Sequence, residues 1–186
     1  MGRWMSRCIV FSCVLALMSA AGARAQYHQE TGIYIQGSGG TFRLSRTNTF
    51  YGGSFGGYRQ WSADKPFALG IDFRGTMMGS GNATGSFSDQ RLDSGQFGFR
   101  LASTPLAQRW SPYAEFLAGF GYFREGQGIT RQDTSTGTFQ AVGGVDLKLG
   151  PVLRWRVGEV TYGRMKGQYY AVHPVTFSSG VVFVLP

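Results

Sequence analysis

The sequence predicts an all-β protein that folds as a closed, eight-stranded, antiparallel up-and-down barrel in a membrane. Eight runs, each of about ten or more residues, alternate apolar side chains with polar or small ones, and turn-rich segments separate them. The number of runs is even, and each run is long enough to cross a bilayer as a tilted strand. The composition agrees, because 15% of residues are aromatic, only 15% are charged, and 29 of the 186 are Gly.

The N-terminal segment has the layout of a cleaved signal peptide. Arg3 and Arg7 make a positive start, residues 8–21 are apolar apart from two serines, and Ala23 and Ala25 satisfy the small-residue rule for cleavage. The apolar stretch is shorter than the roughly 20 residues of a spanning helix. The predicted organisation is therefore a signal peptide, 1–25, followed by an outer-membrane barrel domain, 26–186.

Cleavage removes both cysteines, Cys8 and Cys13, and three of the arginines. The mature chain then has no thiol, which excludes cysteine-based catalysis and cysteine-based metal sites. Fifteen Lys and Arg remain against ten Asp and Glu, a net charge of +5. The basic residues are scattered and form no stripe, so we expect an anionic membrane surface and no nucleic acid as their partner.

The first two runs, 32–44 and 51–61, are rich in glycine. They are interpreted as strands in which packing or curvature needs small residues, since no helix follows to receive a phosphate. In the first run the apolar residues change parity between Ile35 and Phe42. A bulge around residues 37–40 would reconcile the two halves.

The next four runs, 66–78, 93–103, 112–124 and 136–149, show the clearest alternation. One face of each run is bulky and apolar, and the other is small or charged. Glycines recur on the charged face, as expected where side chains crowd a narrow barrel. The bulky face comprises Phe67, Leu69, Ile71, Phe73, Met77, Phe97, Phe99, Leu101, Phe116, Phe120, Tyr122, Phe139, Val145, Leu147 and Leu149.

The last two runs are 152–164 and 174–185. Arg156 and Glu159 have opposite parity, so both can face the same side only if a bulge lies near Gly158. The alternation also permits a soluble sandwich or an exported lipocalin-like barrel that binds an apolar ligand, with the two faces reversed. The length of the runs and the glycines on the charged face favour the membrane barrel.

The segments between the runs predict the orientation. With the N-terminus inside, the periplasmic turns are 62–65, 104–111 and 150–151, and the outer loops are 45–50, 79–92, 125–135 and 165–173. Aromatic residues are expected to form a girdle near each end of the strands. These are Trp61, Trp110, Tyr113 and Trp155 at the periplasmic end, and Tyr51, Tyr122, Tyr162, Tyr169 and Tyr170 at the outer end.

The mature chain resembles the eight-stranded outer-membrane barrels that include the OmpA-like barrels and the opacity-type surface proteins. The resemblance rests on the signal peptide, the eight runs and three loose patterns, which are Pro-Tyr-Ala-Glu at 112–115, Gly-Gly-Val-Asp-Leu at 143–147 and Arg-Trp-Arg-Val at 154–157. It implies a surface protein of the Gram-negative outer membrane whose partners are outer-membrane lipids and the outer-membrane assembly machinery. Members usually end on an aromatic residue, whereas here Phe183 precedes the C-terminal Pro186.

The charged face of the strands predicts a charge network inside the barrel. An eight-stranded barrel is just wide enough for side chains to fill it, so charges there need partners. We expect a structural network that closes the lumen, with a proton or ion path as the alternative. Its predicted members are Asp72, Arg74, Arg100, Glu115, Asp146, Lys148, Arg154, Arg156 and Glu159.

The sequence predicts no catalytic residue, no cofactor and no metal. An outer-leaflet lipid-modifying enzyme would need a serine, a histidine and an acid, but the mature histidines are His28 and His173, and neither belongs to a His-x-Ser pair. The outer loops are rich in Ser, Thr and Gly, and they are the expected contact surface for an extracellular ligand. A structural or surface-interaction role is therefore the leading hypothesis.

Overall fold

A computed structural model describes residues 28–43, 47–62, 66–80, 91–103, 109–125, 132–166 and 171–185. The predicted signal peptide lies outside these residues, as do the central parts of most predicted loops and turns. Within the described ranges, no helix has the length and apolar character needed to cross a membrane.

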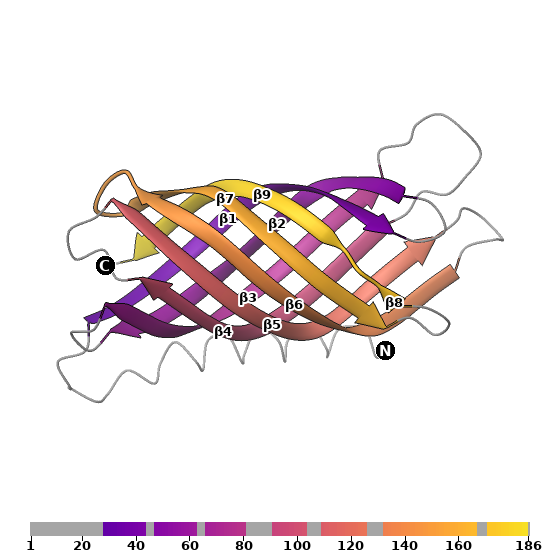
Figure 1. The fold of residues 1–186 in the computed structure, drawn as a ribbon, viewed down its shortest axis with the longest axis horizontal. Coiled ribbons are helices and arrows are strands. Elements are labelled where there is room, and N and C mark those ends of the chain that lie inside the picture. The colour runs from indigo at the N-terminus through magenta and orange to yellow at the C-terminus, as the bar shows by residue number, and fades with distance from the viewer. Residues whose placement is uncertain are drawn as a thin grey trace, which may run out of the picture.

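The described residues form a barrel of long, tilted strands (Figure 1). Each predicted run corresponds to one strand, and the observed ends differ from the predicted ones by a few residues. The strands are β1 (His28–Arg43), β2 (Thr47–Ser62), β3 (Phe67–Ser80), β4 (Arg91–Ser103), β5 (Trp110–Glu125), β6 (Gln132–Lys148), β7 (Leu153–Lys166), β8 (Ala171–Val172) and β9 (Val175–Leu185).

β8 and β9 are two parts of the eighth strand, which is interrupted at His173 and Pro174. Proline has no N–H to donate to a ladder. Its carbonyl still accepts a hydrogen bond from the Gly163 backbone N–H at 2.8 Å, which keeps this segment against β7. The eighth strand therefore follows β7 on both sides of the interruption.

Consecutive strands pair antiparallel, and the sheet closes because β9 pairs with both β1 and β7. Figure 1 shows β9 lying between β1 and β7 along the barrel. Closure pairs both sides of each long strand, which is the condition for crossing lipid with strands, and among the described residues only the two-residue β8 pairs on one side alone. The predicted closed, eight-stranded, antiparallel barrel is confirmed.

The two faces of the wall have opposite chemistry. Most buried side chains point inward and are polar or charged, while large apolar side chains cover the outside. An apolar exterior and a polar interior are what a membrane barrel needs. The lipocalin-like alternative, which required an apolar lumen, is wrong. Exposed large apolar residues include Ile35, Phe55, Phe67, Leu69, Met77, Phe99, Phe116, Phe120, Phe139, Val160, Phe177 and Phe183.

Only one of the two bulges expected in the sequence is present. The register of β1 against β2 and β9 runs without interruption through residues 37–40, so the bulge predicted there is wrong. Side chains at even positions from Tyr34 to Ser38 face inward throughout. In β7 the register shifts between Arg156 and Glu159 on both neighbouring strands, which confirms the bulge near Gly158.

The barrel has two rims. The terminal rim carries the start of β1 and the end of β9, and the loop rim carries the end of β1 and the start of β2. Trp110 and Trp155 are exposed near the terminal rim, and Tyr51 and Tyr162 are exposed towards the loop rim. Tyr113 was expected in the girdle, but its side chain is buried inside the barrel.

The charged lumen as candidate functional site

Eight of the nine predicted network residues lie inside the barrel. Their exposed fractions are 6% or less, and they come from β3, β4, β5, β6 and β7. Inward residues of neighbouring strands stand side by side, so charges far apart in sequence meet at one level of the lumen. The eight are Asp72, Arg74, Arg100, Glu115, Asp146, Arg154, Arg156 and Glu159.

Lys148 is the exception. Its position in β6 has the inward parity, but its side chain is exposed because β6 ends at this residue on the terminal rim. The prediction that Lys148 belongs to the buried network is wrong. An odd or even position predicts which face of a strand a side chain is on. It does not predict how far along the barrel axis the lumen becomes open to solvent.

Glu159 is the centre of the network. Its Oε1 accepts hydrogen bonds from Arg74 Nη1 and from Gln36 Nε2, both at 2.8 Å. Its Oε2 accepts from Arg74 Nη2 at 2.9 Å, from Arg156 Nη1 at 3.3 Å and from the Tyr113 hydroxyl at 2.6 Å. Five donors therefore surround one carboxylate, and the β7 bulge is what turns that carboxylate inward.

Arg100 bridges two further acids. It donates Nη1 to Glu115 and Nη2 to Asp146 Oδ2 at 3.0 Å. Its guanidinium carbon lies 4.3 Å from the ring centroid of Tyr58 and 3.9 Å from that of Tyr113. A buried cation close to two aromatic rings is attracted by both of them.

Arg156 and Arg74 complete the central layer. Arg156 donates Nε to Asp146 Oδ1 at 3.0 Å, while Arg74 donates Nη2 to Glu115 Oε2 at 2.8 Å. Arg74 Nε also donates to the Tyr34 hydroxyl at 3.1 Å, and that hydroxyl donates to Asp72 Oδ1 at 2.8 Å. The three arginines and four acids therefore form one connected set.

Each inward tyrosine in this set is opposite a glycine on the neighbouring strand. Tyr58 is in register with Gly32, Tyr34 with Gly56 and Tyr113 with Gly144. A Cβ added at Gly32 or Gly144 would come within 2.5 Å of the facing ring. The glycines thus leave the space in which the rings lie flat beside the guanidinium groups.

A second ionic cluster lies towards the terminal rim. Arg154 donates Nη2 to Glu30, which also accepts the Tyr58 hydroxyl at 2.9 Å and Gln60 Nε2 at 3.1 Å. Glu30 is not among the predicted network residues, because the predicted first strand begins at residue 32. The signal that could have found it is the even parity that it shares with Tyr34.

Above the charges, towards the loop rim, the lumen becomes hydroxyl-lined and then apolar. Ser38 Oγ lies 2.8 Å from Ser178 Oγ and 3.4 Å from Ser54 Oγ, and Thr76 donates to Ser54 at 3.3 Å. A cavity of about 20 Å³ separates this layer from the apolar residues above, room for about one water molecule. The apolar layer consists of Phe50, Met78, Leu92 and Met165, with Phe123 packed against it.

The arrangement can hold charge and exclude water, but it offers little for other chemistry. The described residues contain no group of three or more His, Cys, Asp or Glu that could hold a metal ion. His173 Nδ1 lies 3.2 Å from the Tyr162 hydroxyl on the outer surface. Ser178, close to it in sequence, lies in the lumen against Ser38.

Comparison with known proteins places the fold. No protein-family model and no curated protein sequence matches the chain. Among solved structures, Neisserial surface protein A is similar with a TM-score of 0.60 and 13% identity, over 82% of this chain and 96% of that one. Ail, the attachment invasion locus protein of Yersinia pestis, also has a TM-score of 0.60 and 13% identity, over 85% of this chain and 99% of that one.

The chain therefore has the fold of small outer-membrane β-barrels. A second structure of Ail, in complex with the heparin analogue sucrose octasulfate, matches this barrel with a TM-score of 0.55 and 15% identity, covering 85% of this chain and 99% of that one. The fold of the OmpA-like and opacity-type barrels, implied by the sequence resemblance, is confirmed. The outer face of the barrel carries the apolar surface that such a location requires.

Proposed function

We propose that this barrel is a surface protein of the outer membrane that does not conduct through its lumen and acts through its loops. The observation that carries the proposal is the buried ionic network, in which Arg74, Arg100 and Arg156 are paired with acids in the central layer of the lumen. A buried charge left without a partner is costly, so the network resists rearrangement into an open path.

Two features support a closed lumen. At the level of Arg100, the rings of Tyr58 and Tyr113 pack against the guanidinium group, with centroids 4.3 and 3.9 Å from its carbon, and they take up space in the lumen. Nearer the loop rim, the apolar layer around Phe50 and Met165 provides a second barrier. Ions would have to cross a layer in which the arginines are paired with acids and then an apolar layer, although Asp72 Oδ2 and Arg154 Nη1 keep no hydrogen-bond partner in the described residues.

The ends of the strands are then the surface available for partners. The Ail structure with a heparin analogue concerns a barrel of the same fold. For this chain we propose an extracellular ligand bound by the loops, export by the predicted signal peptide, and insertion by the outer-membrane assembly machinery. No catalytic role is proposed, because the contact of His173 is a tyrosine and Ser178 is engaged in the lumen.

Single-channel recording in planar lipid bilayers tests the closed lumen. The purified, refolded barrel is expected to give no steady conductance, and a mobility difference between boiled and unboiled samples on SDS gels establishes that the protein used is folded. Large, steady single-channel currents from that folded protein would refute the proposal. A gel shift without currents supports it.

A further inference from the structure

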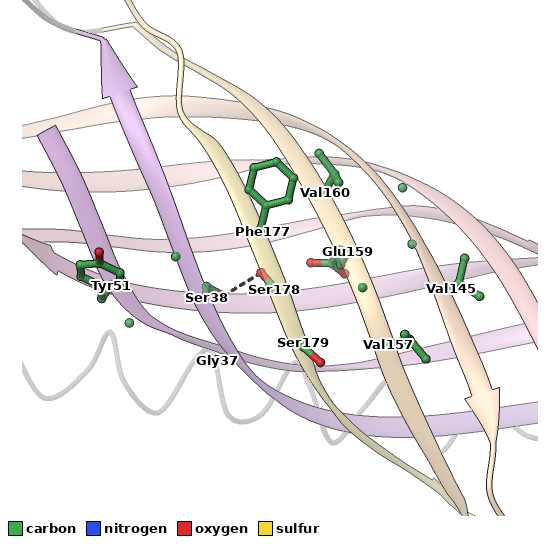
Figure 2. A pocket seen from close by; sticks show the side chains of 15 residues that line it. Gly37, Ser38, Tyr51, Val145, Val157, Glu159, Val160, Phe177, Ser178 and Ser179 are labelled. Atoms are coloured by element: carbon green, nitrogen blue, oxygen red, sulfur yellow. Dashed lines mark hydrogen bonds between the residues drawn. The ribbon is translucent and has the colours of Figure 1, made fainter. Parts of the chain in front are cut away.

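Large side chains do not cover the outer face of the barrel evenly. A shallow, open groove of about 1020 Å³ crosses the outside of β2, β1, β9, β7 and β6 (Figure 2). Three glycines in it, Gly37, Gly143 and Gly158, would have no described heavy atom within 4 Å of an added Cβ. Because glycine has no side chain, these three positions leave the hollow in the wall.

Apolar side chains border this hollow. Phe177 and Val160 are register partners, exposed by 63% and 46%, and stand together at one edge in Figure 2. Val157 and Val145 lie on the β7 and β6 side of the hollow, and Tyr51 lies on its β2 side. Ser179, the hydroxyl on the floor, donates to the Arg156 backbone carbonyl at 3.0 Å. An occupant thus meets apolar contacts and needs no hydrogen-bonding group of its own.

The loop-rim side of the same strands is polar and basic. Tyr162 and Arg164 follow Val160 on the outward face of β7, and both side chains are exposed. His173 contacts the Tyr162 hydroxyl from the neighbouring strand at 3.2 Å. Arg164 is two residues from Tyr162 on the same outward face of β7, and an exposed guanidinium is well suited to bind a phosphate oxygen.

We propose that this groove binds one anionic, phosphate-bearing membrane lipid, with its acyl chain against the glycines and its phosphate at Arg164. The inference rests on the membrane location proposed above. The charge of Arg164 selects the anionic headgroup, and the groove selects a chain that can lie flat against the wall. The lipid belongs to the leaflet at the loop rim, because Arg164 lies near the β7 end of that rim.

Native mass spectrometry of the barrel, released from detergent with added phosphatidylglycerol or phosphatidylcholine, tests this assignment. The first phosphatidylglycerol is expected to bind about fivefold more tightly than phosphatidylcholine, the contribution of roughly one arginine near a charged headgroup. Arg164→Gln should bring that ratio close to one, whereas Arg164→Lys should largely preserve it.

A groove-filling variant tests the chain position. Gly37→Leu places a side chain in open space without displacing the wall, and it should weaken binding of both lipids by about tenfold. The matched control is Gly95→Leu on β4, which is equally open but does not line the groove. It should leave lipid binding unchanged.

Three results would overturn the assignment. The first is that the wild-type barrel binds the two lipids with equal affinity. The second is that Gly95→Leu weakens lipid binding as much as Gly37→Leu does. The third is that Gly37→Leu abolishes a dimer of the barrel and leaves lipid binding unchanged, which would make a second copy of the chain the occupant of the groove. Reconstitution into vesicles and the gel shift are measured separately. Failure of those two assays would instead contradict the proposed membrane location.

Discussion

The carboxylate of Glu159 offers the sharpest test of the charge network. Glu159→Gln keeps the size of the side chain but removes the negative charge that faces Arg74 and Arg156. Removing one partner of a buried ion pair typically costs about 3–5 kcal/mol. With five donors directed at this group, we expect the free energy of unfolding to fall by about that amount.

Two milder substitutions, one beside Glu159 and one on the terminal rim, provide a scale for this loss of stability. Tyr113→Phe removes only the hydroxyl that donates to Glu159 at 2.6 Å, and a hydrogen bond to a charged group contributes about 1.5–3 kcal/mol. Lys148→Gln removes an exposed charge and is expected to change stability by less than about 0.5 kcal/mol. The expected order of destabilisation is therefore Glu159→Gln, then Tyr113→Phe, then Lys148→Gln.

Urea unfolding in lipid vesicles, followed by tryptophan fluorescence and by the gel shift, measures these differences. Trp61, Trp110 and Trp155 provide the fluorescence signal, and none of them is altered by the substitutions. If Glu159→Gln were no more destabilising than Lys148→Gln, the network would not be holding the barrel together. The reasoning for a closed lumen would then lose its foundation.

Two further predictions concern the backbone. Gly144→Ala should destabilise the barrel by about 1–3 kcal/mol in the same urea assay, because the Tyr113 ring must move, while Gly143→Ala, which faces outward into open space, should be nearly neutral. Deleting Val157 should remove the bulge and leave a regular ladder, so the gel shift should persist. Deleting Phe99 from the unbulged β4 would reverse the faces of half of that strand and should abolish folding.

The strands and their faces could be predicted because a bilayer imposes both length and alternation on the sequence. In run 66–78 every outward position except Gly75 carries a large apolar side chain, and in run 93–103 Phe97, Phe99 and Leu101 share the outward face, so the alternation identifies that face in both. The bulge near Gly158 could also be predicted, since Arg156 and Glu159 cannot otherwise share a face. In these cases the chemistry of single residues determined the geometry.

The missed features have physical reasons too. In β1 the glycines at 37, 39 and 40 interrupt the alternation, so the apparent change of parity at Phe42 was taken for a bulge. That error hid Tyr34 and Gln36 as partners of the network. The tyrosine rings beside the arginines depend on which residues are in register between strands, and alternation within one strand does not contain that information.

The seam between β1 and β9 has a consequence for the order of assembly. Contacts across it join residues that are very far apart in the chain, with Gln36 and Glu159 separated by 123 positions and Ser38 and Ser178 by 140. Because such long loops close slowly, these contacts form last. Until then Glu159 lacks its Gln36 donor and Glu30 lacks Arg154, whereas pairs between neighbouring strands, such as Arg100 with Glu115, do not depend on the seam. We therefore expect the Arg154–Glu30 pair to form only when the ring closes.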